Sequence, residues 1–316
     1  MGSIEKIEEY QNNSGYSFLL YLCKKNYMQL IVYILAYPLL WLISMLPFRV
    51  FYWLSDFVYF LVYYVLGYRK KVVRENLAIT LPNLSDKERK TIEKKFYQHM
   101  CDMFLEMIKT MTIAPEEMDK RFTVTNIEVL REYELKGKSI VLLASHYASW
   151  EWLLTLNKKM KFRSIAVYKK IANPYFDKLV RKIRSKYDAE LVETRKTIPL
   201  MAQNQRDGIL SLYGLASDQS PKMDRIFHWK TFMGIDVPVH TGAEMLAKKY
   251  DLSVLFVKVK KIKRGFYEAT FVPICDNPKE FSEFEITEMY LKEVEKQILE
   301  APEYYLWTHK RWKYKR

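Results

Sequence analysis

Two apolar segments lie near the N-terminus of the chain. Residues 29–46 are almost wholly apolar around Pro38, and residues 51–67 form a second run that Ser55 and Asp56 interrupt. Each run approaches the roughly 20 residues that a helix needs to cross a bilayer. Basic residues flank the pair on both outer sides, whereas Arg49 alone lies between the runs: Lys24, Lys25, Arg69, Lys70, Lys71 and Arg74.

By the positive-inside tendency this charge pattern predicts that both ends of the pair face the cytoplasm. The pattern fits a shallow hairpin in the membrane, or one span followed by an interfacial helix. The alternative is a buried helical hairpin in a soluble core. We expect membrane attachment, because the runs are long and rich in Tyr and Trp. Residues 1–26 are polar and lack a cleavage site after a short apolar core, so no removable signal peptide is predicted.

The next pattern is an amphipathic helix with a polar start. Ser85 and Glu88 have the spacing of a capping box. Apolar residues then recur at helical spacing until the helix ends before Pro115: Ile92, Phe96, Met100, Met103 and Met107. This methionine-rich face is expected to belong to the core and not to a cofactor site.

Strand-like and helix-like patterns alternate from about residue 137 onward. Short apolar runs predict strands at residues 140–144, 164–168 and 209–216, and a strand pair at 253–259 and 266–274. Helices are predicted at 150–156, 174–186 and 241–250, with a last one that Pro302 ends. We therefore expect the α/β class, a mixed sheet between helices. The predicted division is a membrane-associated helical segment at residues 1–67 and a domain at residues 68–316.

The charge of the chain adds a prediction about its partners. The sequence contains 51 Lys and Arg against 37 Asp and Glu, a formal charge of +14. A nucleic acid, an acidic carrier protein or an anionic lipid would suit this charge. Basic and aromatic residues mix at 307–316, and basic residues cluster at 258–264. Next to the apolar N-terminal segments this composition suits an anionic bilayer surface, and ordinary solvated charge is the alternative. The three cysteines lack metal or disulfide spacing.

One histidine follows a predicted buried strand. His146 comes directly after residues 140–144, and Glu151 lies five residues later. If His146 occupies the turn and Glu151 the first helical turn, the carboxylate can orient the imidazole as a general base. Five histidines and 37 acids make such a spacing common by chance, so a structural histidine is the alternative. The chain has no GxSxG, Walker, HExxH or GxGxxG motif, which leaves those classes unsupported.

Two further residues are candidates for the same site. Arg184 could reach it as a partner for an oxyanion or phosphate, or lie on the wet face of the helix at 174–186. Asp218 follows the strand at 209–216, where open α/β sheets place their sites, although it could be an ordinary turn residue.

Several ordered motifs then carry a resemblance to a known family. They are Arg74–Leu77, His146–Glu151, Tyr168–Asp177 leading to Arg184, Ser217–Gln219, Phe232–Gly234 and Leu306–Lys313. Together they resemble the bacterial lipid A late acyltransferases (lauroyl and myristoyl acyltransferases), within the lysophospholipid acyltransferase-like superfamily. The sequence departs from the usual motifs at Lys169, where an Arg often stands, and at Asp218–Ser220, where an acid-His-acid motif is common.

The resemblance implies a membrane-bound O-acyltransferase on the cytoplasmic face of the bacterial inner membrane. It would move a fatty acyl chain from a thioester of acyl carrier protein or CoA to a hydroxyl of a lipid A precursor, an anionic glycolipid. The alternative acceptors are a lysophospholipid, an aminoacyl lipid or another glycolipid. No metal, other cofactor or nucleic acid is implied. By resemblance the catalytic residues are His146, Glu151 and Arg184, with Lys169, Asn173, Asp218 and Gln219 at the substrate.

Overall fold

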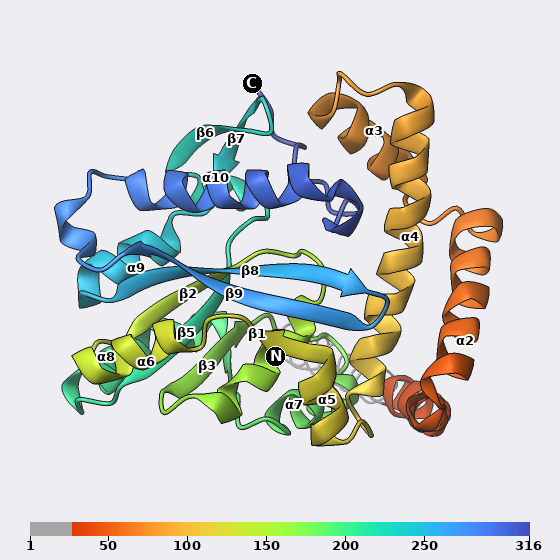
Figure 1. Cartoon of the computed structure of the whole chain (residues 1–316), viewed down its shortest axis with the longest axis horizontal. Coiled ribbons are helices and arrows are strands. Elements are labelled where there is room, and N and C mark those ends of the chain that lie inside the picture. The colour runs from red at the N-terminus through yellow and green to blue at the C-terminus, as the bar shows by residue number, and fades with distance from the viewer. Residues whose placement is uncertain (1–26) are drawn as a thin grey trace, which may run out of the picture.

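A seven-stranded sheet forms the centre of the computed structural model, which describes residues 27–316 (Figure 1). The strand order is β1-β9-β8-β2-β5-β3-β4. All neighbours are parallel except β8 and β9, which are antiparallel. The strand bounds are β1 Phe122–Val124, β2 Ile140–Ala144, β3 Arg163–Tyr168, β4 Glu190–Glu193, β5 Ser211–Ala216, β8 Ser253–Lys263 and β9 Phe266–Cys275. The sheet is mixed, as the α/β prediction requires.

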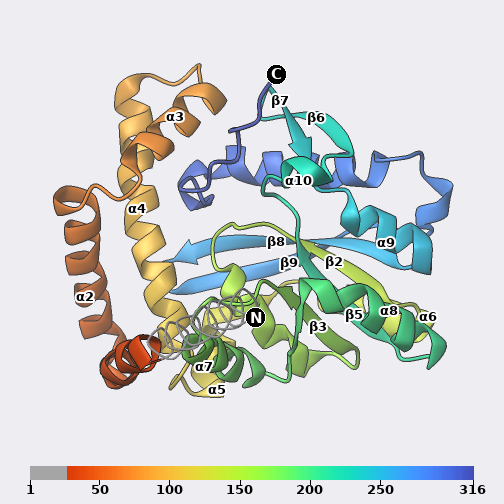
Figure 2. The same ribbon diagram turned by 180° about the vertical axis from the view of Figure 1, so that it is seen from behind.

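Helices cover both sides of this sheet. Figures 1 and 2 show α10 above the sheet, with α5, α6, α7 and α8 below it. The bounds are α5 Pro115–Arg121, α6 Glu128–Lys136, α7 Pro174–Ser185, α8 Thr197–Arg206, α9 Gly242–Tyr250 and α10 Glu285–Glu300. Residues 140–143 of β2 are all buried, because the strand lies in the middle of the sheet with both faces covered.

Helix α4, Asp86–Lys109, runs past the end of the sheet to which the β8–β9 turn points (Figure 1). The predicted capping box is present at its start: Glu88 N donates to Ser85 Oγ, and Ser85 N donates to Glu88 Oε2. Met100 and Met103 are buried, so the methionine-rich face belongs to the core as predicted.

The first two helices of the described chain lie on the outer side of α4 (Figure 1). The helix Tyr27–Met45 is long and apolar enough to cross a membrane, and almost none of its apolar window is buried. Helix α2, Phe48–Phe60, continues as a π-helical turn, Leu61–Val65, and then bends by 86° into α3, Lys70–Thr80. Helix α2 packs on α4 and buries Phe51 and Ser55, whereas Trp53 on its other side is 72% exposed. The predicted flanking pair Lys24 and Lys25 lies outside the described residues.

Most of the predicted elements after residue 137 are confirmed. The exception is the helix expected at 150–156, which is a 3-10 helix, Trp150–Lys159. Elements without a clear hydrophobic pattern were not predicted: β1, β4, α6, α8 and the separate hairpin of β6, His228–Phe232, with β7, Ile235–Val239.

The prediction that the two basic runs form a bilayer-binding surface is wrong for several of their residues. In the C-terminal run, Trp307, Arg311 and Trp312 are buried in the core. In the hairpin run, Arg264 forms ion pairs with Asp56 of α2 and Asp102 of α4. The sequence pattern alone does not show that Arg311 and the two Trp rings are buried and that Arg264 is paired, although most Lys residues of the two runs are exposed.

Candidate active site

The ends of two neighbouring strands bring His146 and Asp218 together. Strands β2 and β5 are parallel, and Ala144 is in register with Ala216. His146 and Asp218 each lie two residues beyond these partners, so they emerge at the same edge of the sheet. This is the edge at which open α/β folds place their sites.

Asp218 holds His146 through two hydrogen bonds. The His146 backbone N–H donates to Asp218 Oδ2 over 3.0 Å, and ring atom Nδ1 lies 2.7 Å from Asp218 Oδ1. A carboxylate accepts hydrogen bonds, so Nδ1 carries the proton and the neutral ring presents Nε2 as an acceptor. The Asp218 side chain is 1% exposed and the imidazole 24% exposed. The site therefore has the geometry of an oriented base with a buried carboxylate behind it.

The electrostatics of the pair follow from burial and mutual attraction. Burial lowers the pKa of His146, but the charge and hydrogen bond of Asp218, with a smaller contribution from Glu151, raise it to a value above the ordinary one. Burial raises the pKa of Asp218, and the charge and hydrogen bonds of His146 outweigh this and lower it. Asp218 is therefore ionised at neutral pH, as an orienting carboxylate must be.

Glu151 has a different partner from the one expected. Its oxygens accept two hydrogen bonds from Arg184, Nη2 to Oε1 over 2.7 Å and Nε to Oε2 over 3.1 Å. This bidentate pair joins the 3-10 helix to α7. The carboxylate bonded to the imidazole is Asp218, so the expectation that Glu151 holds the ring of His146 does not match the geometry. Glu151 is near enough to affect His146 by its charge alone.

The backbone around His146 is fixed by the C-terminal part of the chain. Leu306 N donates to His146 O over 3.1 Å, and Ala148 N donates to Tyr304 O over 3.0 Å. Ala148 has a φ of 48°, a conformation that residues other than glycine adopt only where their surroundings hold it. The Trp150 ring packs edge-on to the imidazole at 5.4 Å between centroids.

Three polar side chains that interact electrostatically with Asp218 were missed from the sequence: Arg311 is buried, His309 is half-buried and His240 is exposed. Burial lowers the pKa of His309 to about 4, and its Nδ1 has no partner within the described residues. Arg311 is completely buried and donates from Nη1 to Pro238 O. Desolvation and the charge of Arg311 lower the pKa of His240, and the charge of Asp218 opposes this shift. The motif at residues 306–313 contains His309 and Arg311, and it was the signal that these two residues belong to the site.

The remaining predicted residues have mixed positions. Gln219 is half-buried next to Asp218, and Lys169 is exposed in the loop after β3. Asn173 caps α7, with Oδ1 accepting from Tyr175 N and Nδ2 donating to Gln29 O. Substrate contacts of these three residues stay predictions. Within residues 27–316, no three His, Cys, Asp or Glu side chains form a group suited to a metal ion.

A buried carboxylate behind a partly exposed imidazole is the arrangement of a general base, and comparison with known proteins defines the class of enzyme that uses it. The profile of the family described as bacterial lipid A biosynthesis acyltransferase matches residues 23–314, so the chain belongs to this family and is an acyltransferase. Among its relatives, the lipid A biosynthesis lauroyltransferase of Escherichia coli (strain K12) is 27% identical over 282 residues, 88% of this chain and 90% of that protein. The lipid A biosynthesis acyltransferase 2 of Shigella flexneri is 23% identical over 147 residues, 46% of this chain and 47% of that protein.

Proposed function

We propose that this acyltransferase moves a fatty acyl chain from a carrier thioester to a hydroxyl of a lipid A precursor, with His146 as general base. The observation that carries the proposal is the hydrogen bond from Nδ1 of His146 to Asp218, since it leaves Nε2 free to accept a proton. The family and the lauroyltransferase relative support a lipid A acceptor and a fatty acyl group.

The reaction would proceed by direct transfer. Nε2 of His146 takes the proton from the acceptor hydroxyl as the oxygen attacks the thioester carbonyl. The tetrahedral intermediate collapses, the C–S bond breaks, and the imidazolium returns its proton to the leaving thiolate. The products are an ester and a free thiol. Asp218 stabilises the imidazolium between the two proton transfers, because its charge is buried beside the ring.

Glu151 and Arg184 would act together as a positioning pair. Arg184 donates hydrogen bonds from Nε and Nη2 to Glu151, and its Nη1 makes no hydrogen bond within residues 27–316. A guanidinium held in this fork has one nitrogen left for the thioester or the oxyanion. The pair would fix the direction of this donor, and Glu151 would add a negative charge near the imidazolium.

We propose that the protein works at the cytoplasmic face of the bacterial inner membrane. The helix Tyr27–Met45 supports attachment, because it exposes a long apolar surface. The outer side of α2 adds exposed Trp53 and Phe57 close to that helix in the chain. Acyl carrier protein or CoA would supply the thioester from the cytoplasm.

The test is acyl transfer by the purified full chain in detergent. Acyl carrier protein and CoA thioesters are each combined with a lipid A precursor, a lysophospholipid and an aminoacyl lipid, and the products are identified by mass spectrometry. We expect acylation of the lipid A precursor and loss of nearly all turnover in His146→Ala.

His228→Ala is the matched control. His228 also has a carboxylate partner, Glu288 at 3.1 Å, but it lies on β6 away from the site. This variant should act like the wild type. Preference for another acceptor would overturn the assignment of the substrate, and full turnover by His146→Ala would overturn the mechanism.

A further inference from the structure

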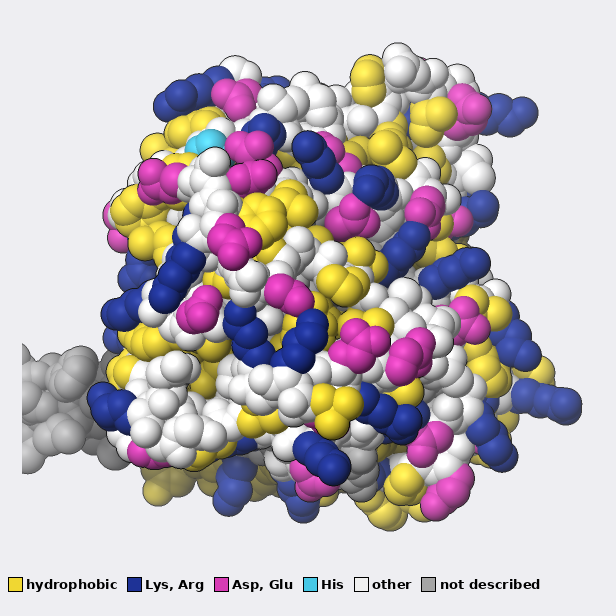
Figure 3. All heavy atoms as spheres, turned by 60° about the vertical axis from the view of Figure 1, so that its left-hand side comes forward, with side chains coloured by type: hydrophobic (Ala, Val, Ile, Leu, Met, Phe, Trp, Pro, Cys, Tyr) yellow, Lys and Arg dark blue, Asp and Glu magenta, His cyan; other side chains and the backbone are white. Residues whose placement is uncertain are grey.

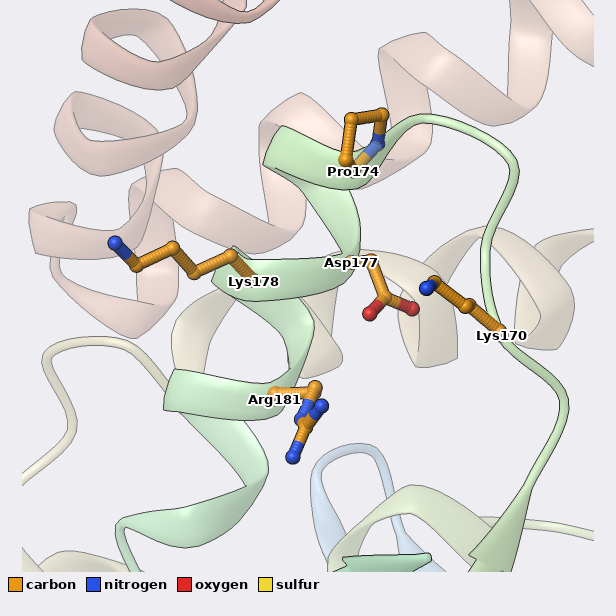
Figure 4. A pocket seen from close by; sticks show the side chains of 5 residues that line it. All are labelled: Lys170, Pro174, Asp177, Lys178 and Arg181. Atoms are coloured by element: carbon orange, nitrogen blue, oxygen red, sulfur yellow. The ribbon is translucent and has the colours of Figure 1, made fainter. Parts of the chain in front are cut away.

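A cavity on the surface of α7 is separate from the residues used above. Its volume is about 270 Å³, and its lining consists of Lys170, Pro174, Asp177, Lys178 and Arg181. Figure 4 shows Lys170 and Arg181 on the same side as Asp177, while the ammonium of Lys178 extends away from them. The charged groups of Lys170 and Arg181 therefore lie on one side of the cavity, and Lys178 lines it with the aliphatic part of its side chain.

The one acid in this lining, Asp177, forms no ion pair with the cations in the described structure, and its single negative charge is smaller than their combined positive charge. Asp177 is buried, and its oxygens accept from Ile171 N over 2.9 Å and from Tyr168 Oη over 3.3 Å. These bonds hold the loop that carries Lys170 against the first turns of α7. Neither Lys170 nor Arg181 forms an ion pair within the described part of the chain.

Several cations elsewhere on the molecule are paired with acids. Arg163 and Arg184 are paired with Glu190 and Glu151. On the face shown in Figure 3, Lys and Arg side chains alternate with Asp and Glu. At the cavity, Lys170 and Arg181 outnumber the single acid Asp177, so the lining carries a net positive charge that suits an anion.

The position of the cavity identifies the kind of anion. The start of α7 packs against the start of the apolar helix Tyr27–Met45: the Tyr33 and Tyr175 rings stack at 5.8 Å, and Asn173 donates to Gln29 O over 3.2 Å. A basic cavity at the end of an apolar helix that enters a bilayer lies at the depth of the lipid headgroups. The anion present in quantity at this depth is the phosphate of a lipid.

We propose that Lys170 and Arg181 bind the phosphate group of an anionic lipid in this cavity. Arg181 precedes Arg184 by three residues of α7, about 4.5 Å along the helix axis, and therefore lies on a neighbouring part of the same helix face. A lipid held by its phosphate would therefore lie next to the Glu151–Arg184 pair. The inference rests on the proposed membrane location and does not depend on the proposed acyl transfer.

The experiment measures binding to the purified full chain in a neutral detergent, without an acyl donor, by native mass spectrometry. The probes are dioctanoyl phosphatidic acid, dioctanoylglycerol with the same tails and no phosphate, and inorganic phosphate. Wild type should bind the phosphatidic acid more tightly than either control probe. Lys170→Gln/Arg181→Gln should lose about tenfold or more, because two charge-assisted contacts disappear.

The matched control is Lys161→Gln/Lys182→Gln, which removes two exposed positive charges that do not line the cavity. It should stay within about threefold of wild type, as expected for solvated surface charge. Equal losses in the two double variants, equal binding of dioctanoylglycerol, or inorganic phosphate bound as tightly as the lipid would each overturn the proposal. His146→Ala should keep lipid binding, so failure of the proposed reaction is distinguishable from failure of this site.

Discussion

Asp218→Asn tests the assignment of the orienting carboxylate, because the two hydrogen bonds of Asp218 constrain an amide in a defined way. One oxygen accepts from the backbone N–H of His146 and the other from Nδ1. The backbone N–H is always a donor, so the single oxygen of Asn must face it. The amide NH₂ then faces Nδ1, which becomes an acceptor, and the proton moves to Nε2.

The expected loss of turnover is large. The ring would carry its proton on the atom that must accept one, and the buried charge behind the imidazolium would be gone. The same change in a Ser-His-Asp triad lowers turnover on the order of 10⁴-fold through the wrong tautomer. We expect a loss of about 10³- to 10⁴-fold, which corresponds to about 4–5.5 kcal/mol in the activation free energy.

The assay is steady-state acyl transfer across pH, with folding checked by thermal unfolding. Wild-type turnover should rise as His146 loses its proton, at a pKa above its ordinary value. Because Asp218 supplies the main upward shift, this rise should move to lower pH for the residual activity of Asp218→Asn. Asp276→Asn is the control, since Asp276 is hydrogen-bonded to Tyr133 and Lys136 away from the site. If Asp218→Asn keeps turnover within tenfold of wild type while Glu151→Gln loses it, Glu151 orients the base and our assignment is wrong.

Three further predictions concern the free energy of unfolding, measured by chemical denaturation. Glu151→Gln and Arg184→Gln should show a coupling of about 1–3 kcal/mol in a double-mutant cycle, since they form one bidentate pair, and strictly additive losses would contradict that pair. Gly265→Ala should cost about 2 kcal/mol or more, because its φ is +74° and a Cβ would lie 1.9 Å from Tyr52 Oη; an unchanged midpoint would refute this. Burial raises the pKa of Glu106, so wild type loses stability as pH rises above about 4.5, the ordinary pKa of this group. Glu106→Gln does not ionise, and its free energy of unfolding should therefore increase relative to that of wild type over this pH range. A difference between the two proteins that does not change with pH would refute this explanation.

The elements of the fold were predictable from the sequence where a continuous run of apolar residues marked a buried strand. Central strands such as β2 and β5 are continuous apolar runs, and both were located from the sequence. Short edge strands such as β4, with polar residues at both ends, carry no such pattern and were missed. Edge positions need less apolar surface, so tertiary pairing decides them and local preference does not.

The site shows the same division between local and distant information. The sequence located His146 at a strand end and identified Asp218 as a strand-end acid. It paired His146 with Glu151 because those residues are five positions apart, whereas the actual partner is 72 positions away. The pairing depends on the register of β2 against β5, which sequence spacing does not contain.

A chain of contacts connects the N-terminal helices to the catalytic segment. Tyr52 of α2 donates from Oη to Glu106 Oε1, and Tyr267 of β9 donates to Glu106 Oε2, both over 2.8 Å. Trp152, next to Glu151, is buried against the same turn of α4 and donates from Nε1 to Thr110 Oγ1 over 3.1 Å. Helix α4 therefore supports both the helix that exposes apolar rings and the 3-10 helix that carries the Glu151–Arg184 pair. If α2 inserts into a bilayer as proposed, these contacts would fix the distance between the membrane surface and the site, because a close-packed core transmits displacement. These contacts are consistent with the proposed attachment to a membrane.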